Sequence, residues 1–155
     1  MKGLSRPITI LMAEDDPDDR MLTEMAWKDG RLANELKFVS DGEELLDYLY
    51  HRGKYHDPAD APRPGIILLD LNMPRKDGRE ALKEIKADPV LRCIPIVVLT
   101  TSKAEEDILR TYDLGANSFI TKPVSFHALI DLMKTLRKYW LEIVELPPQQ
   151  DGDPA

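Results

Sequence analysis

The sequence is poor in cysteine and histidine and carries fewer basic than acidic residues. Its one cysteine, Cys93, excludes an intramolecular disulfide framework and a multi-cysteine zinc site, and we expect it to be a small packing residue. The formal net charge of -7, from 28 acidic and 21 basic residues, argues against a nucleic-acid binder and against attraction to anionic lipid.

Long hydrophobic runs are also missing. The longest are about six residues, too short to cross a membrane, and residues 1–7 contain no apolar stretch typical of a secretory signal. A length of 155 residues with 43% hydrophobic residues is typical of one globular domain. We therefore expect a cytoplasmic domain over residues 7–146, a disordered polar tail over 147–155, and no output domain.

Five short apolar runs alternate with helical patterns, which predicts an α/β fold with a parallel sheet. The runs are 8–13, 36–39, 66–69, 94–99 and 118–121. The first, third and fourth are almost continuously apolar, as strands covered on both faces are, whereas the second and fifth contain polar residues. This pattern predicts a flavodoxin-like, doubly wound sheet of order 2-1-3-4-5 with helices on both faces.

Several helix boundaries are marked by capping residues. Asp16-Pro17 reads as an N-cap followed by proline at the first helical position. Asp41-x-x-Glu44 has the spacing of a capping box. We expect the third helix over about 78–87, ended by the Asp-Pro pair that follows.

Acidic residues follow two of the strands expected in the centre of the sheet. Residues 14–19 hold five acids among six positions, and Asp70 closes the third apolar run. The later acids of the first group suit a helix N-terminus. That position does not explain Glu14 and Asp15, which end a buried strand.

Strands 1 and 3 flank the point of the sheet where open α/β folds bind ligands, so Glu14, Asp15 and Asp70 should converge. Two carboxylates about 4 Å apart repel by roughly 4 kcal/mol at an effective dielectric constant of 20. Such a group requires a cation or raised pKa values. Oxygen ligands favour Mg²⁺, and the alternative is a hydrated acidic rim without a metal.

Strand 4 ends at Thr100 and strand 5 ends next to Lys122. Both therefore belong to the same sheet edge as Asp70. A hydroxyl and an ammonium facing a metal-bound carboxylate make a site for a phosphoryl group on that carboxylate. Taken singly, the threonine is an ordinary strand residue and the lysine an ordinary surface charge.

Together these residues resemble the pattern of response-regulator receiver domains over about residues 7–138. The matching motifs are Glu14-Asp15, Leu-Asp-Leu-Asn-Met-Pro at 69–74, Thr100 and Lys122-Pro123. The resemblance implies a phosphoacceptor signalling protein rather than an enzyme, one that promotes only its own phosphotransfer and dephosphorylation.

The resemblance also assigns roles within the site. Asp70 accepts phosphate from a sensor histidine kinase. Asp15, Asp70 and the backbone carbonyl of Asn72 bind Mg²⁺, and Glu14 assists through water. Glu14 departs from the aspartate that is commoner in the family at this position. The exposed part of the first helix is the family's usual surface for docking the kinase.

Two further features are implied only by the family. Phe119 occupies the aromatic switch position, where Thr100 moves toward the phosphoryl group and the ring turns inward. The alternative is a core phenylalanine on an edge strand. The Lys122-Pro123 bond is expected to be cis.

A finer resemblance points to the single-domain regulators paired with bacterial phytochromes. It rests on the long, proline-containing loop over 53–65 and on the stretches 71–80, 99–108 and 139–147. A light-signalling pathway with a phytochrome kinase is therefore expected.

The last helix, expected from about Ser125 to Val144, is apolar over a wide arc. One stripe faces the core and consists of Phe126, Leu129, Ile130, Met133, Leu136 and Trp140. A second stripe lies beside it and predicts a homodimer. The predicted interface residues are Leu132, Tyr139, Trp140 and Ile143. Alternatively, the end of the helix folds back onto its own domain.

Two other protein classes remain as alternatives. A magnesium-dependent aspartyl-phosphate phosphatase of the haloacid-dehalogenase kind uses similar groups, but its nucleophile closes the first strand in an Asp-x-Asp motif, which 14–17 does not contain. A flavodoxin would require hydroxyls and amides in its first loop, where five acids would repel the FMN phosphate.

Overall fold

All five predicted strands form, and they pair in parallel in one sheet of order β2-β1-β3-β4-β5. They are β1 (Thr9–Ala13), β2 (Glu35–Val39), β3 (Pro64–Leu69), β4 (Ile96–Thr100) and β5 (Ser118–Thr121). The computed structural model describes residues 8–28, 35–71, 73, 76–101, 108, 110, 112–123 and 125–143, the last three by backbone alone. The predicted fold class and strand order are confirmed.

Burial along the strands follows the pattern expected from the sequence. Every residue of β1 and β4 is buried, whereas β5 is only half-buried throughout and β2 is buried only at its last residue. The central strands are covered by helices on both faces, and the two edge strands expose part of their side chains because no further strand lies beyond them.

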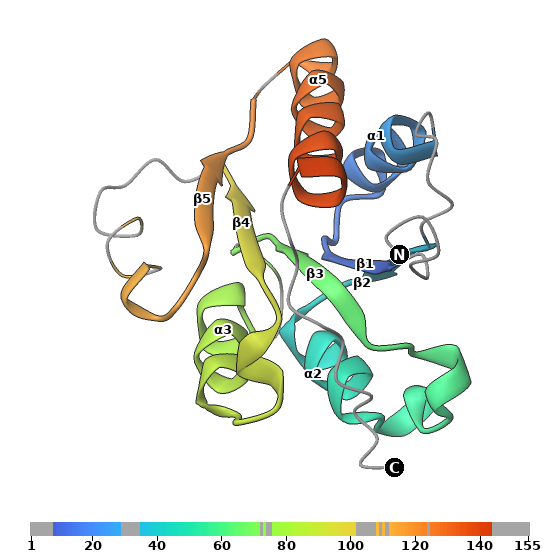
Figure 1. The fold of residues 1–155 in the computed structure, drawn as a ribbon, viewed down its shortest axis with the longest axis vertical. Coiled ribbons are helices and arrows are strands. Elements are labelled where there is room, and N and C mark those ends of the chain that lie inside the picture. The colour runs from blue at the N-terminus through green and yellow to red at the C-terminus, as the bar shows by residue number, and fades with distance from the viewer. Residues whose placement is uncertain are drawn as a thin grey trace.

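Helices cover both faces of the sheet. Figure 1 shows α1 (Pro17–Lys28) and α5 (Phe126–Arg137) on one side and α2 (Gly42–Tyr50) and α3 (Gly78–Ala87) on the other. Alternate residues of a strand point to opposite faces. In β1, Met12 belongs to the apolar cluster under α1 and α5, and Leu11 belongs to the cluster under α2 and α3.

The caps agree with the sequence except at one bond. Asp16 Oδ1 accepts from the N–H of Asp18 at 2.8 Å, and Asp41 Oδ1 accepts from the N–H of Glu44 at 2.8 Å. In a capping box Glu44 would return a bond to the N–H of Asp41. Instead Glu44 Oε1 accepts from the N–H of Ser40 at 2.7 Å. The Tyr55 hydroxyl and the Lys54 ammonium, which lie beyond α2, hold the other oxygen of this carboxylate.

The segment predicted as a long loop is more ordered than expected. It contains two short 3-10 turns, η2 (Gly53–Tyr55) and η3 (Pro58–Asp60), and its last two residues already belong to β3. A further 3-10 turn, η4 (Leu91–Cys93), precedes β4. Cys93 is exposed at the end of this turn, so its prediction as a packing residue is wrong.

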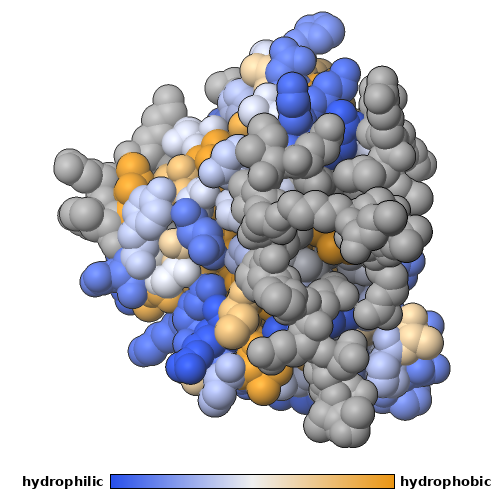
Figure 2. Space-filling view, in the orientation of Figure 1, coloured by the Kyte–Doolittle hydropathy of each residue, from blue (hydrophilic) through white to orange (hydrophobic). Residues whose placement is uncertain are grey.

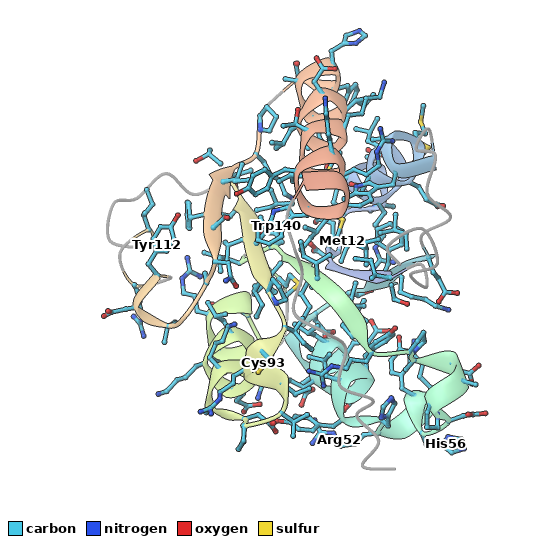
Figure 3. All side chains as sticks on the ribbon, in the orientation of Figure 1. Met12, Arg52, His56, Cys93, Tyr112 and Trp140 are labelled. Atoms are coloured by element: carbon cyan, nitrogen blue, oxygen red, sulfur yellow. The ribbon has the colours of Figure 1, made fainter. Side chains whose placement is uncertain are left out.

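The last helix is confirmed over α5, which continues as a π-helix, η5 (Lys138–Ile143); Val144 lies outside the described residues. Four residues of the predicted core stripe are buried as expected: Leu129, Met133, Leu136 and Trp140. Figure 3 shows Trp140 between α5 and the sheet.

Two predictions for this helix are wrong. Phe126 is 65% exposed, contrary to its prediction as a core residue, because α5 starts beyond the carboxyl edge of the sheet. Trp140 is 9% exposed and belongs to the core cluster, so its prediction as an interface residue is wrong.

The surface is mixed in character. On the face shown in Figure 2, hydrophilic side chains lie around the start of α5 and over α3, with smaller hydrophobic areas between them. Within the described part of the chain, no helix is both long and apolar enough to cross a membrane.

Candidate functional site

Three carboxylates meet where β1 and β3 end. Ala13 and Leu69, the last residues of these strands, are register partners, and the N–H of Asp70 donates to Ala13 O at 3.1 Å. Glu14, Asp15 and Asp70 each offer one oxygen, and these oxygens lie within 4.8 Å of one another. The convergence expected from the strand order is present in the structure.

The three carboxylates differ in burial. Glu14 is 1% exposed and Asp70 is 7% exposed, whereas Asp15 is exposed. Two of the charges therefore lie at the bottom of the site and one faces solvent. Burying carboxylates without a compensating positive charge is strongly unfavourable.

Lys122 supplies that positive charge. Its ammonium donates to Glu14 Oε1, to Asp19 Oδ2 at 2.9 Å and to Asp70 Oδ2 at 3.2 Å. Its backbone N–H donates to Thr100 O at 2.8 Å, which holds the end of β5 against β4. We call Glu14, Asp15, Asp70 and Lys122 the acid pocket.

The pKa values in the acid pocket reflect both burial and pairing. Burial raises the pKa of Glu14 to about 7, because it outweighs the hydrogen bond from Lys122. Burial by itself would lower the pKa of the Lys122 ammonium, but its bonds to Glu14 and Asp19 raise that pKa above the ordinary lysine value. Lys122 is therefore charged at neutral pH.

The donor set of the acid pocket fits a divalent cation. Three carboxylate oxygens within 4.8 Å are hard ligands of the kind that Mg²⁺ and Mn²⁺ take. Asp15 is exposed and so lies on the solvent side of these three carboxylates. Asn72, whose carbonyl was expected as a ligand, lies outside the described residues.

The two residues expected to respond to phosphorylation lie on the β4–β5 side of the pocket. Thr100, the last residue of β4, is fully buried. Phe119 of β5 is half-buried and packs against the cluster under α2 and α3. Its N–H donates to the hydroxyl of Tyr112 at 3.2 Å.

The Lys122–Pro123 bond is trans, contrary to expectation, since no peptide bond among the described residues is cis. The trans form is favoured by about 0.5–1 kcal/mol for a bond preceding proline. In this conformation the Lys122 ammonium already contacts three carboxylates.

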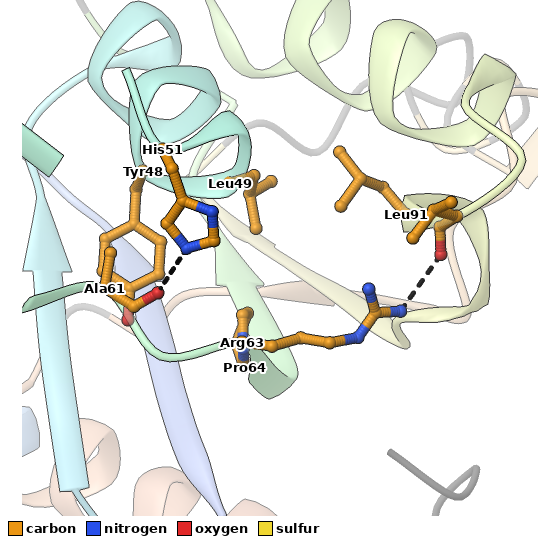
Figure 4. A pocket seen from close by; sticks show the side chains of 8 residues that line it. Tyr48, Leu49, His51, Ala61, Arg63, Pro64 and Leu91 are labelled. Carbon is orange, nitrogen blue, oxygen red and sulfur yellow. Dashed lines mark hydrogen bonds between the residues drawn. The ribbon is translucent and has the colours of Figure 1, made fainter. Parts of the chain in front are cut away.

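A hollow of about 120 Å³ lies at the opposite edge of the sheet, beside the start of β3. Figure 4 shows the His51 ring beside its wall, with Nε2 2.9 Å from Ala61 O. Arg63 closes another side and donates to Val90 O at 3.0 Å. No member of the acid pocket lines this hollow.

Comparison with known proteins identifies the family. The family model described as the response regulator receiver domain matches residues 10–134. The chain belongs to the response regulator receiver family. The family and the receiver function predicted from the sequence are confirmed, and the phosphatase alternative is not favoured. Receiver domains bind a divalent metal and act with a histidine kinase.

Relatives of this receiver domain are similar over nearly the whole chain. Response regulator Rcp1 from Synechocystis sp. is 41% identical over 141 residues, 91% of this chain and 94% of Rcp1. The phosphorylated cyanobacterial phytochrome response regulator RcpA has a TM-score of 0.87 and 43% identity, covering 92% of this chain and 99% of its own. The Mn²⁺-bound form of Rcp1 has a TM-score of 0.86 and 41% identity, covering 91% and 99%.

Sequence reasoning missed two residues at the receiver site. Asp19 was explained by its place in the first turn of α1, yet its carboxylate turns back to Lys122. Arg20, in the same turn, donates from Nε to Glu14 O at 2.6 Å. The turn that follows Glu14 brings the Asp19 carboxylate to Lys122 and the Arg20 guanidinium to the Glu14 carbonyl. Their spacing in the sequence alone did not distinguish them from surface charges.

Proposed function

We propose that Asp70 accepts a phosphoryl group from a histidine kinase and that Mg²⁺, bound by Asp15, Asp70 and the carbonyl of Asn72 with Glu14 assisting through water, promotes the transfer. The observation that carries this proposal is the position of Asp70 Oδ2, 3.2 Å from the Lys122 ammonium and inside the three-carboxylate cluster. A carboxylate in such a place can act as a nucleophile, because the Lys122 ammonium already lies where the negative charge of the attached phosphoryl group would be.

The transfer forms one bond and breaks one. An Asp70 carboxylate oxygen attacks phosphorus, the P–N bond of the kinase phosphohistidine breaks, and the imidazole leaves with its electron pair and takes up a proton. Lys122 donates to one phosphoryl oxygen and the Thr100 hydroxyl donates to another. A metal ion held at Asp15 and Asp70 would supply further positive charge to compensate the phosphoryl group and the carboxylates around it.

The response to phosphorylation runs through β4 and β5. A hydrogen bond donated by the Thr100 hydroxyl to the phosphoryl group draws the end of β4 toward Asp70. The Phe119 ring then turns further inward, into the space beside Thr100. A phenylalanine has no hydroxyl to satisfy, so this inward packing leaves no buried polar atom unpaired. The signal then passes on by protein contact at the β5 and α5 surface.

The kinase is proposed to be a bacterial phytochrome acting in the cytoplasm. The relatives named as phytochrome response regulators support this choice. The docking surface is proposed to be the outer side of α1, which starts directly after the acid pocket. It carries Met21 and Met25, one helical turn apart and 55% and 54% exposed, an apolar pair suited to a partner helix.

Two phosphate donors test this function together. Acetyl phosphate and a phytochrome kinase should both label the wild-type chain in Mg²⁺, and Asp70→Asn should abolish both reactions while the far-UV circular dichroism is unchanged. Asp16→Asn is the matched control and should still be labelled. The double variant Met21→Glu/Met25→Glu should slow phosphoryl transfer from the kinase but not labelling by acetyl phosphate. Labelling of Asp70→Asn would refute the proposal.

We also propose that the chain forms a homodimer through the outer side of α5 and η5. Tyr139 is 49% exposed, and Leu132 is only partly buried against the core; the side chain of Ile143, the third proposed contact, lies outside the described residues. Sedimentation of the wild type against Tyr139→Glu tests the interface. A wild type that is monomeric at tens of micromolar, with or without acetyl phosphate, would refute it.

A further inference from the structure

An arginine of α1 holds the backbone on which the acid pocket is built. Arg20 Nε donates to Glu14 O at 2.6 Å, and Arg20 Nη2 donates to Ser40 Oγ at 2.7 Å. Its guanidinium carbon lies 5.3 Å from the centre of the Phe38 ring. A planar guanidinium fixed by two acceptors and a ring face holds its acceptors in a defined geometry.

The contact at Ser40 continues into α2. The N–H of Ser40 donates to Glu44 Oε1 at 2.7 Å. The other oxygen, Glu44 Oε2, accepts from the Tyr55 hydroxyl at 2.6 Å and from Lys54 Nζ at 2.8 Å. Glu44 thus joins the end of β2 to η2, which explains why its carboxylate does not complete a capping box with Asp41.

The far end of this chain of contacts is anchored in the core. Tyr55 packs against the apolar cluster under α2 and α3, and its ring lies 5.1 Å from that of Tyr48, centre to centre. Tyr48 is almost fully buried. The η2 turn is therefore held in place and is connected by successive hydrogen bonds to the main chain of Glu14.

We propose that Arg20 is a positioning residue for the phosphoacceptor site and that Ser40, Glu44 and Tyr55 fix Arg20 from the η2 segment. This inference rests on the proposed function of Asp70. We call these four residues the Arg20 relay.

The main chain of Glu14 explains why the relay matters for metal binding. Its N–H donates to Val39 O at 2.9 Å, and its C=O accepts from Arg20, so one peptide on each side of Glu14 is fixed. The next residue, Asp15, is exposed and depends on this backbone for its position. The positive charge of Arg20 by itself disfavours a nearby cation, so its effect on Mg²⁺ comes from the position that it gives to this backbone.

Titration of Mg²⁺ into the apo chain, followed by the amide shift of Asp70 in NMR spectra, measures the effect without any phosphate chemistry. Arg20→Gln should weaken Mg²⁺ binding about tenfold, as loss of a group that orients a ligand does. Arg20→Lys keeps an N–H donor but not the planar fork that reaches both Glu14 O and Ser40 Oγ, and should recover only part of that loss. Labelling by acetyl phosphate should slow in the same order.

A second variant tests the remote end of the relay. Tyr55→Phe removes only the hydroxyl that donates to Glu44, and should weaken Mg²⁺ binding about threefold. Tyr50→Phe is its matched control: the Tyr50 hydroxyl donates to Asp88 at 3.1 Å, outside the relay, and binding should be unchanged. The double variant Arg20→Gln/Tyr55→Phe should bind no more than about twofold more weakly than Arg20→Gln, because both act along one path.

The outcomes separate this inference from the proposed function. Unchanged Mg²⁺ affinity in Arg20→Gln, or a Tyr55→Phe that behaves like Tyr50→Phe, would overturn the relay; if Arg20→Gln does not fold, Tyr55→Phe decides. A wild type that binds Mg²⁺ but is not labelled at Asp70 contradicts the proposed function and leaves the magnesium comparison valid.

Discussion

The side chains of Lys122 and Asp70, 52 residues apart in the chain, meet at 3.2 Å. Lys122 also contacts Glu14, whose side chain is 1% exposed, and its own side chain is 7% exposed. One ammonium therefore compensates two buried carboxylates. The same group that is proposed to bind the phosphoryl oxygens also stabilises the site before phosphorylation.

Removing this ammonium should destabilise the fold. Lys122→Met leaves Glu14 and Asp70 buried without a positive partner, and we expect the free energy of unfolding in urea at pH 8 to fall by about 3 kcal/mol. Mg²⁺ should restore part of the loss. The matched control is Lys54→Met. Lys54 pairs with Glu44 at 2.8 Å, but its side chain is 71% exposed, so this substitution should change the free energy of unfolding by no more than about 0.5 kcal/mol. Equal effects would show that pairing in the pocket contributes nothing.

Magnesium binding should depend unequally on the two neighbouring acids. Asp15→Asn removes a charge and a direct ligand, so we expect Mg²⁺ affinity to fall strongly, by about a hundredfold. Glu14→Gln, proposed to act through water and already paired with Lys122, should cost about tenfold. Asp18→Asn, in the same acidic run but outside the carboxylate cluster, should have little effect. Equal losses for Asp15→Asn and Glu14→Gln would contradict the assigned roles.

Much of this geometry could be predicted from the sequence because it depends on periodicity and on strand ends. Continuously apolar runs predicted the central strands, and apolar runs that contain polar residues predicted the edge strands. Because the strands are parallel, their carboxyl ends bring Glu14, Asp70, Thr100 and Lys122 to one edge of the sheet. The predicted convergence needed only the strand order.

The features that the sequence did not predict depend on side-chain direction in three dimensions. The Glu44 carboxylate accepts from Ser40 and Tyr55, contacts that its capping-box spacing does not encode. Phe126 has the spacing of a core residue but lies beyond the sheet edge. Asp19 contacts Lys122 and Arg20 contacts the Glu14 carbonyl because the short turn between β1 and α1 folds the first turn of the helix back toward the end of the strand.

The Glu44 contacts predict a specific pH dependence of stability. Although burial opposes it, hydrogen bonds from Lys54, Tyr55 and Ser40 lower the pKa of Glu44 below its ordinary value of 4.5. A depressed folded-state pKa gives stability that is present above the unfolded value and lost as pH falls through the folded value. The free energy of unfolding lost in Glu44→Gln should thus be largest near neutral pH and shrink below about pH 4.5. If the free energy of unfolding lost in Glu44→Gln does not change with pH, the loss comes from packing and not from the charge of Glu44.

The open side of the edge strand β5 offers the last prediction. Lys122 N–H donates to Thr100 O, so alternate N–H groups of β5 face β4 and the Phe119 N–H points away from it. The Tyr112 hydroxyl accepts from that N–H at 3.2 Å. Tyr112→Phe should therefore speed hydrogen exchange of the Phe119 amide about fivefold, the value for one lost hydrogen bond. Tyr50→Phe, a change at an exposed tyrosine of α2 whose hydroxyl donates to Asp88, is the control and should leave this amide unchanged. Phosphorylation by acetyl phosphate should reduce the protection in the wild type, because the proposed inward turn of Phe119 disturbs the bond. Equal protection in Tyr112→Phe and wild type would show that the hydroxyl does not hold the strand edge.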